Sequence, residues 1–313
     1  MFEGLKNGAK IFKDSLHVLV KYPVFAVPLL IVWLLMAPLV LYTYFNSETM
    51  LQGLDIAGAL FILFGIIYFY SLLFSFSCII MLELIQQHET GKPLNLKAAV
   101  AEGFQKDFIA VLVLSFFWAI IWVILTVIEA LLSSVKDKNK RSEQSTREAA
   151  KALTGQGGAF SWLGLGIDMV RKLVRLFIFL VLPAVAWEDR GVIGAVKRGG
   201  SVVKSHISEF LTAYAGSGFA AALIFLPLAI FFQATENMTL PDYYYYIAIT
   251  YGAMAWVLSM YIEQMNMALL FMWHKKWETA SQKAQAAGKP IPTMSEIPMP
   301  SLLDDIPDLL EQP

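Results

Sequence analysis

Four ionisable residues lie close together in an otherwise apolar segment of the sequence. Asp168, Arg171, Lys172 and Arg175 are spaced so that a helix would carry all four on one face. An ionisable side chain within a membrane span is energetically costly, and it faces protein or a water-filled cavity where it finds a partner. Three cations on one helical face are therefore suited to binding an anionic headgroup or an anionic solute.

Polar partners for these cations occur in other apolar segments: Glu263, Gln264, Asn266, Glu129 and Glu83. The ligand-binding hypothesis assigns the anionic group to Arg171, Lys172 and Arg175, gives Glu263 the role of counter-charge, and counts Gln264 and Asn266 among the ligand-binding residues. Two structural alternatives stay open. The charges could form an ion-pair network between helices, or the charged part could be an extension of the helix outside the membrane.

Other patterns that carry chemistry are missing from the sequence. The four histidines form no pair with the spacing of metal ligands, and there is a single cysteine, so we predict no metal site and no cofactor. The chain also has no GxxxxGK loop, no GxSxG and no HExxH. We therefore do not expect an enzyme, and an intramembrane lipid-modifying enzyme is the weakest alternative.

The composition indicates a membrane protein. Of the 313 residues, 57% are apolar and only 16% are charged, whereas about a quarter of the residues of a typical soluble domain are charged. A water-soluble core cannot bury so much apolar surface. A soluble globular enzyme, a disordered chain and a nucleic-acid-binding domain are thereby excluded.

The apolar segments predict an all-α, polytopic protein with six transmembrane helices. A span needs about 20 apolar residues, and continuous apolar runs without period-two alternation favour helices over barrel strands. Five runs are long enough: Tyr22–Phe45, Leu54–Leu82, Phe108–Leu132, Phe210–Phe232 and Tyr243–Trp273. A sixth, Ser161–Trp187, contains the four ionisable residues, and its uncharged part is too short to cross alone. We count it as a span because six crossings bring both termini to the same side of the membrane.

Lysine and arginine between the spans predict that both termini are inside. Residues 1–21, 86–107 and 188–209 are basic, whereas the loops 46–53 and 233–242 have no Lys or Arg. The loop 133–160 is an exception, because it carries six Lys and Arg residues and would lie outside. Either a basic loop is translocated or the segment 161–187 does not cross.

Three similar tripeptides suggest an internal repeat. His88-Glu89-Thr90, Trp187-Glu188-Asp189 and Trp277-Glu278-Thr279 follow one another at intervals of 99 and 90 residues. They divide a membrane domain, 1–279, into units 1–90, 91–189 and 190–279. We predict a pseudo-threefold repeat of an amphipathic helix plus a helical hairpin. The alternative is that any six-span protein with basic inner loops looks threefold.

The basic segments before the hairpins predict interfacial amphipathic helices. Their apolar stripes would face the membrane, with lysines toward anionic headgroups. Either these helices only orient the hairpins, or they recognise a particular anionic lipid or a partner protein. The lysines assigned to the membrane surface are Lys6, Lys10, Lys13, Lys21, Lys197 and Lys204.

Tryptophans and small residues in the spans have simpler interpretations. Trp33, Trp118, Trp122 and Trp256 fit aromatic belts and packing. The small residues of 213–222 allow close helix packing within the protomer or, alternatively, between copies in an oligomer.

The last segment, 280–313, is rich in proline and has no Lys or Arg after Lys289. This composition predicts a disordered acidic cytoplasmic tail. Its stretch Leu302–Leu310 has leucines clustered among acids and is a candidate for folding on a partner protein. The alternative is an inert solubilising tail.

The second junction, from Leu182-Pro183 through Glu188-Asp189-Arg190-Gly191 to Ala195-Val196-Lys197-Arg198, resembles a loose group of bacterial multi-span membrane proteins of unknown function. That group is similar to the membrane domain attached to some glycerophosphodiester phosphodiesterases. Lys21-Tyr22-Pro23, at the start of the first span, resembles the opening of the same group. The resemblance implies a bacterial cytoplasmic (inner) membrane location, and it assigns no catalytic residue.

The leading functional hypothesis is an integral membrane protein that binds lipid or an anionic amphiphile and assists transport or envelope assembly. The alternative is a membrane scaffold subunit that docks partner proteins through its tail and span surfaces. The expected partners are membrane lipids, and no nucleic acid.

Overall fold

The computed structural model describes residues 2–46, 52–134, 162–236 and 240–298, together with positions 49, 50, 238, 300 and 302. In this part of the chain every regular element is helical and no strand occurs, so the all-α class is confirmed. The long helices are α2 (Val27–Phe45), α4 (Ile56–Glu89), α6 (Phe108–Ser134), α8 (Trp162–Ala186), α10 (Ile207–Ala234) and α11 (Asp242–Ala286). The remaining elements are α1 (Phe2–Lys21), η1 (Pro23–Ala26), α5 (Leu96–Glu102), the π-helical turn η2 (Gly103–Asp107), α9 (Val192–Ser205) and η3 (Met294–Glu296).

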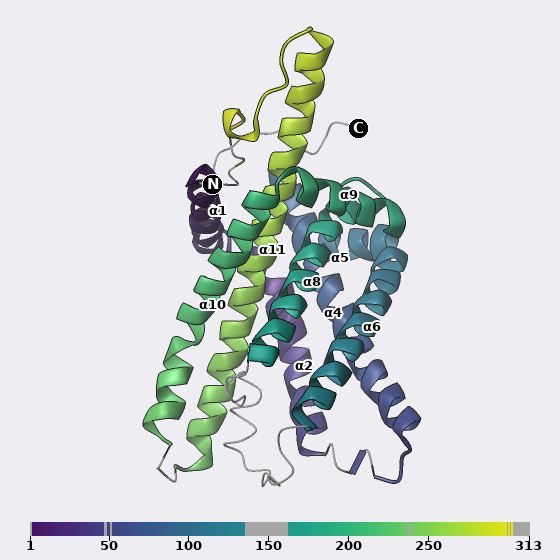
Figure 1. Cartoon of the computed structure of the whole chain (residues 1–313), viewed down its shortest axis with the longest axis vertical. Coiled ribbons are helices and arrows are strands. Elements are labelled where there is room, and N and C mark those ends of the chain that lie inside the picture. The colour runs from purple at the N-terminus through teal and green to yellow at the C-terminus, as the bar shows by residue number, and fades with distance from the viewer. Residues whose placement is uncertain are drawn as a thin grey trace.

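The long helices form one bundle and run alternately up and down (Figure 1). Five helical segments of the described chain are long and apolar enough to cross a membrane: Pro23–Thr43, Ile56–Glu89, Leu96–Glu129, Ile207–Ala234 and Asp242–Ala286. Figure 1 places α1, α9 and the C-terminal part of α11 at the same end of the bundle, called the inner end below. These features are those of an integral membrane protein.

Helix α8 differs from the other five long helices because four ionisable residues interrupt its apolar sequence, and it is not among the five candidate spans. It nevertheless lies within the bundle and packs against α4, α6, α9 and α11. It runs antiparallel to α6 and α10, and it begins above the lower ends of its neighbours (Figure 1). The sixth crossing therefore stays a prediction.

The order of elements repeats three times: α1 precedes α2 and α4, α5 precedes α6 and α8, and α9 precedes α10 and α11. The amphipathic helices also pack in a cyclic pattern. Helix α5 packs on α4, and α9 packs on α8, so each of these two contacts the hairpin that comes before it in the sequence. Helix α1, which has no hairpin before it, packs on the last hairpin, α10 and α11. A threefold repeat would produce this pattern, and the repeat itself stays a prediction.

The core is concentrated in the C-terminal halves of α4 and α8 and in the middle of α11. Residues 78–85, 178–187 and 259–274 form uninterrupted buried stretches, so these three helix segments are surrounded by protein on all sides. The outward-facing apolar side chains of α2, α6 and α10, such as Leu35, Leu131 and Phe219, are exposed. That distribution suits helices whose outer faces contact lipid.

Helix α1 uses its apolar side differently from the interfacial arrangement that we expected. Ile11, Ser15 and Val18 are buried, and α1 packs mainly on α10 and α11. Its cations Lys10 and Lys13 are exposed on the other side. The apolar stripe therefore packs on protein, whereas contact between the lysines and lipid headgroups stays a prediction.

Helix α11 continues beyond the predicted end of its span, so the predicted domain boundary at residue 279 falls inside a helix. The chain then turns back along α11: the indole Nε1 of Trp277 donates to the carbonyl of Pro292 at 2.9 Å, and that of Trp273 to the carbonyl of Ile297 at 3.0 Å. Leu302 is buried, and its carbonyl lies 2.9 Å from Nε2 of His88. Residues 135–161, which include most of the basic loop, and residues 303–313, which include most of the predicted partner segment, lie outside the described residues.

Candidate ligand-binding site

Arg175 and Lys172 on α8 share one buried carboxylate on α11. The Nε and Nη2 atoms of Arg175 lie 2.7 and 2.9 Å from the two carboxylate oxygens of Glu263, which is a bidentate pair. The Nζ atom of Lys172 lies 3.9 Å from Glu263 and donates to the carbonyl of Tyr214 at 3.1 Å. The side chain of Glu263 is only 1% exposed. This group, which we call the inner triad (Lys172, Arg175 and Glu263), carries a net charge of +1.

Arg171 forms a separate outer triad with Glu129 and Asp168. Its guanidinium lies 2.6 Å from Glu129 and 3.3 Å from Asp168, and it also donates to the hydroxyl of Thr126. The carboxylates are 44% and 68% exposed. The outer triad carries a net charge of −1. The charges of the two triads therefore cancel in sum, while the more buried inner triad remains positive.

A glycine on α10 makes room for Lys172. A Cβ atom at Gly218 would lie 2.9 Å from the Nζ atom of Lys172. The lysine also lies over the ring of Tyr214, with its Nζ atom 4.8 Å from the ring centroid. At this position the stretch of small residues on α10 therefore accommodates a cation of the inner triad.

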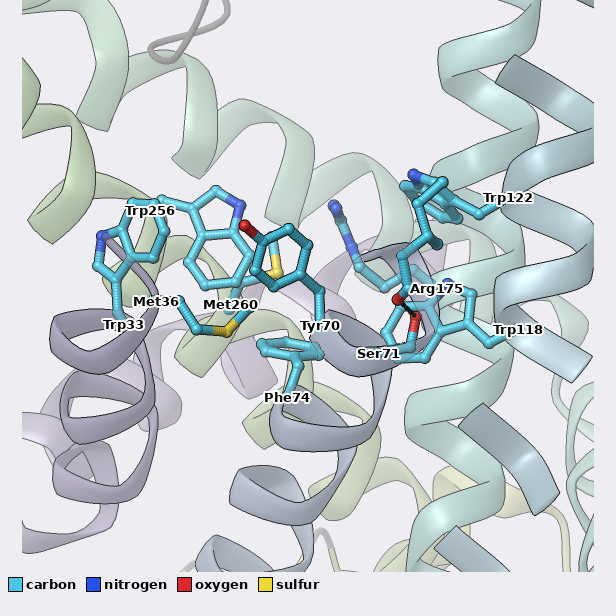
Figure 2. Close-up of a pocket in the computed structure, with 11 residues that line it drawn as sticks. Trp33, Met36, Tyr70, Ser71, Phe74, Trp118, Trp122, Arg175, Trp256 and Met260 are labelled. Carbon is cyan, nitrogen blue, oxygen red and sulfur yellow. Dashed lines mark hydrogen bonds between the residues drawn. The ribbon is translucent and has the colours of Figure 1, made fainter. Parts of the chain in front are cut away.

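A cavity of about 400 Å³ adjoins the inner triad, with walls from α2, α4, α6, α8 and α11. Figure 2 shows Trp33 and Trp256 on one side of it, and Trp118 and Trp122 on the other side near Arg175. The ring centroids of Trp33 and Trp256 are 5.3 Å apart. The remaining lining residues are Met36, Ile67, Tyr70, Ser71, Phe74 and Met260.

The polar atoms of this cavity are mostly hydrogen-bond donors. Guanidinium and indole N–H groups donate and cannot accept, whereas the hydroxyls of Tyr70 and Ser71 can do both, and that of Ser71 donates to the carbonyl of Ile67 at 2.8 Å. Among the described residues, none accepts a hydrogen bond from the indole nitrogen of Trp33, although that nitrogen is buried. The cavity therefore matches a molecule with an apolar body and acceptor oxygens, such as a carboxylate or a phosphate.

The structure separates the six predicted site residues into three groups: the inner triad, Arg171 in the outer triad, and the two amides Gln264 and Asn266. Of the six, only Arg175 lines the cavity, and Glu263 and Lys172 pair behind it. Gln264 donates to the carbonyl of Phe179 at 3.4 Å, and Asn266 accepts from Ser15 at 2.7 Å. These two amides connect α11 to α8 and α1, and neither lines the cavity.

Sequence reasoning missed the aromatic walls, because it assigned the tryptophans to interface belts and packing. Trp118 and Trp122 lie one helical turn apart on α6, and their ring centroids are 6.0 Å apart. That spacing was a usable signal that both share one face. The convergence of Trp33 and Trp256 with them depends on how α2 and α11 are rotated in the bundle, which the spacing does not give.

The inner end holds a second polar cluster, away from the cavity. Arg198 on α9 contacts Glu188 at 3.0 Å and Glu278 on α11 at 2.5 Å. Nε2 of His206 lies 2.7 Å from Nδ1 of His274, and burial lowers the pKa of His206. These contacts join α9 to α11. No group of His, Cys, Asp and Glu in the described part of the chain is arranged to hold a metal ion.

The chain matches no family model, no curated protein and no solved structure, so its resemblance to the multi-span group similar to phosphodiesterase membrane domains stays a prediction.

Proposed function

We propose that this integral membrane protein binds an anionic amphiphile in the aromatic cavity, with the anionic group at Arg175. The observation that carries the proposal is an apolar, tryptophan-lined cavity of about 400 Å³ with one guanidinium on its wall. Arg175 is paired, but its carboxylate is shared with Lys172, which leaves a positive charge for the ligand to balance.

The surroundings of the inner triad strengthen its attraction for an anion. Charges interact more strongly in a poorly polarisable environment than in water, and Lys172 and Arg175 are mostly shielded, with side chains 16% and 20% exposed. Indole N–H groups on the cavity wall supply further donors for acceptor oxygens. A neutral hydrocarbon would leave these donors without partners.

We also propose that α8 is a sixth crossing and that both termini are cytoplasmic. The proposal is supported by the antiparallel course of α8 between α6 and α10, and by the gathering of α1, α9 and the end of α11 at the inner end (Figure 1). Cysteines placed at Lys92 and Arg147, in a chain with Cys78 replaced, would test it with a membrane-impermeant maleimide. Labelling from opposite sides is expected, and labelling from the same side would rule out the sixth crossing.

The test of ligand binding uses the protein in nanodiscs and follows tryptophan fluorescence, because four tryptophans surround the cavity. Dodecyl phosphate is compared with dodecyl maltoside, which has the same chain and a neutral headgroup. We expect saturable binding of the phosphate only, and binding about tenfold weaker or more in Arg175→Gln, since a charge-assisted hydrogen bond contributes about 1.5–3 kcal/mol.

The matched control is Arg171→Gln, which removes a cation of the same helix that does not line the cavity. Its binding constant is expected to stay within about twofold of the wild type, because the outer triad is partly exposed and screened. The double variant Arg175→Gln/Glu263→Gln keeps a neutral hydrogen-bonded pair if Arg175→Gln alone fails to fold. Equal binding by wild type and these Arg175 variants would refute the proposal.

A further inference from the structure

A second hollow lies beside the aromatic cavity, on the other side of α8. This groove has a volume of about 470 Å³ and is walled by α6, α8, α9 and α10. Its lining consists only of apolar side chains, among them Leu114, Phe117, Leu173, Phe177, Val203 and Phe210. Since no lining residue has a charged or hydroxyl group, the groove suits a hydrocarbon and not a polar headgroup.

The groove and the cavity share one wall residue, Trp118. Its ring lies 5.7 Å from that of Phe74, which lines the cavity, and 6.3 Å from that of Phe179 on α8. Trp118 is 6% exposed, so it is enclosed between the two spaces. Its side chain is therefore part of the wall that the two spaces have in common.

Helix α8 contributes different faces to the two spaces. Arg175 lines the cavity, whereas Leu173, Val174 and Phe177 line the groove. Residues two positions apart on a helix point about 200° apart, so Arg175 lies on the opposite side of α8 from Leu173 and Phe177. The groove is open to the outside of the bundle, because its lining residues Phe117 and Ile121 on α6 are 55% and 37% exposed.

We propose that the groove holds the hydrocarbon chain of the amphiphile whose anionic group binds Arg175, and that the ligand is a membrane lipid that reaches the site sideways from the bilayer. This inference rests on the proposed function and adds the class of ligand. The shared wall at Trp118 carries it, since a water-soluble anion would have no use for an adjoining apolar groove that is open toward lipid.

The test uses photo-crosslinking in nanodiscs with two probes. One is a dodecyl phosphate with a diazirine at the end of its chain, and the other is a butyl phosphate with the same group. Labelled peptides are identified by mass spectrometry, and specific labelling is the part removed by excess unlabelled dodecyl phosphate. The long probe is expected to label the groove residues of α6, α8 and α10, and the short probe only the walls of the cavity.

A groove-filling variant provides the second arm. Leu173→Trp places a larger side chain in the groove and should abolish specific labelling of α6 and α10 by the long probe, while the short probe still labels the cavity. The matched control is Leu223→Trp on α10, at a position that is 51% exposed and does not line the groove. It should leave the labelling by both probes unchanged.

The outcomes separate the two proposals. If neither probe gives specific labelling that depends on Arg175, the proposed function fails. If labelling depends on Arg175 but the long probe labels only α2, α4 and α11, or if Leu173→Trp leaves it unchanged, the ligand binds without the groove and this inference is overturned.

Discussion

The two ion-pair groups on α8 have cations at adjacent positions, Arg171 and Lys172, and differ in almost every physical respect. The outer triad has one cation between two carboxylates that are 44% and 68% exposed. The inner triad has two cations around a carboxylate that is 1% exposed. Arg171 faces α6 and Lys172 faces α10, so one residue along the sequence changes the partner helix, the burial and the sign of the net charge. The comparison shows that the spacing of charges identifies a polar helix face but not which charges are available to a ligand.

The largest effect should come from removing the shared carboxylate. Glu263→Ala leaves Lys172 and Arg175 shielded without their counter-charge, and breaking a buried pair in this way costs about 3–5 kcal/mol. We expect a marked loss of folded protein, measured by thermal unfolding and size-exclusion chromatography in detergent.

The double variant Glu263→Gln/Arg175→Gln should recover much of that stability, because it removes a charge of each sign. If Glu263→Ala unfolded at the wild-type temperature, the inner triad would be solvated like the outer one, and the contrast between the triads would not exist.

The smallest effect should come from the outer triad. Glu129→Gln removes one of two partly exposed partners of Arg171, and exposed ion pairs contribute only about 0–1 kcal/mol. Asp168 and Thr126 remain within reach of the guanidinium. We expect the unfolding temperature to change little and dodecyl phosphate to bind as in the wild type. A loss as large as that of Glu263→Ala would mean that the outer triad is as buried in the membrane as the inner one.

Part of this structure could be predicted from the sequence. The apolar runs gave the helices, the spacing of residues 168–175 gave the charged face, and Glu263 and Glu129 were identified as partners because few other acids occur in the apolar segments. Gln264 and Asn266 were predicted to bind the ligand, yet positions one and three residues from Glu263 on a helix point in other directions. They contact Phe179 and Ser15 instead.

The aromatic cavity and the groove could not be predicted, because both depend on the rotation of each helix about its axis. Trp118 illustrates the difficulty. In the sequence it is one of many apolar residues of α6, but in the structure it lines both the cavity and the groove, which together are walled by seven helices. The packing of α1 was missed for a related reason. An amphipathic pattern shows that one side is buried, and it does not distinguish burial in lipid from burial against α10 and α11.

The contact between Leu302 and His88 has a consequence for how the molecule is made. His88 ends the first hairpin, whereas Pro292, Ile297 and Leu302 follow the last one and contact Trp277, Trp273 and His88 in turn. The chain that continues from the last hairpin thereby contacts the first. During translation the contact at His88 can therefore form only after residue 302 has left the ribosome.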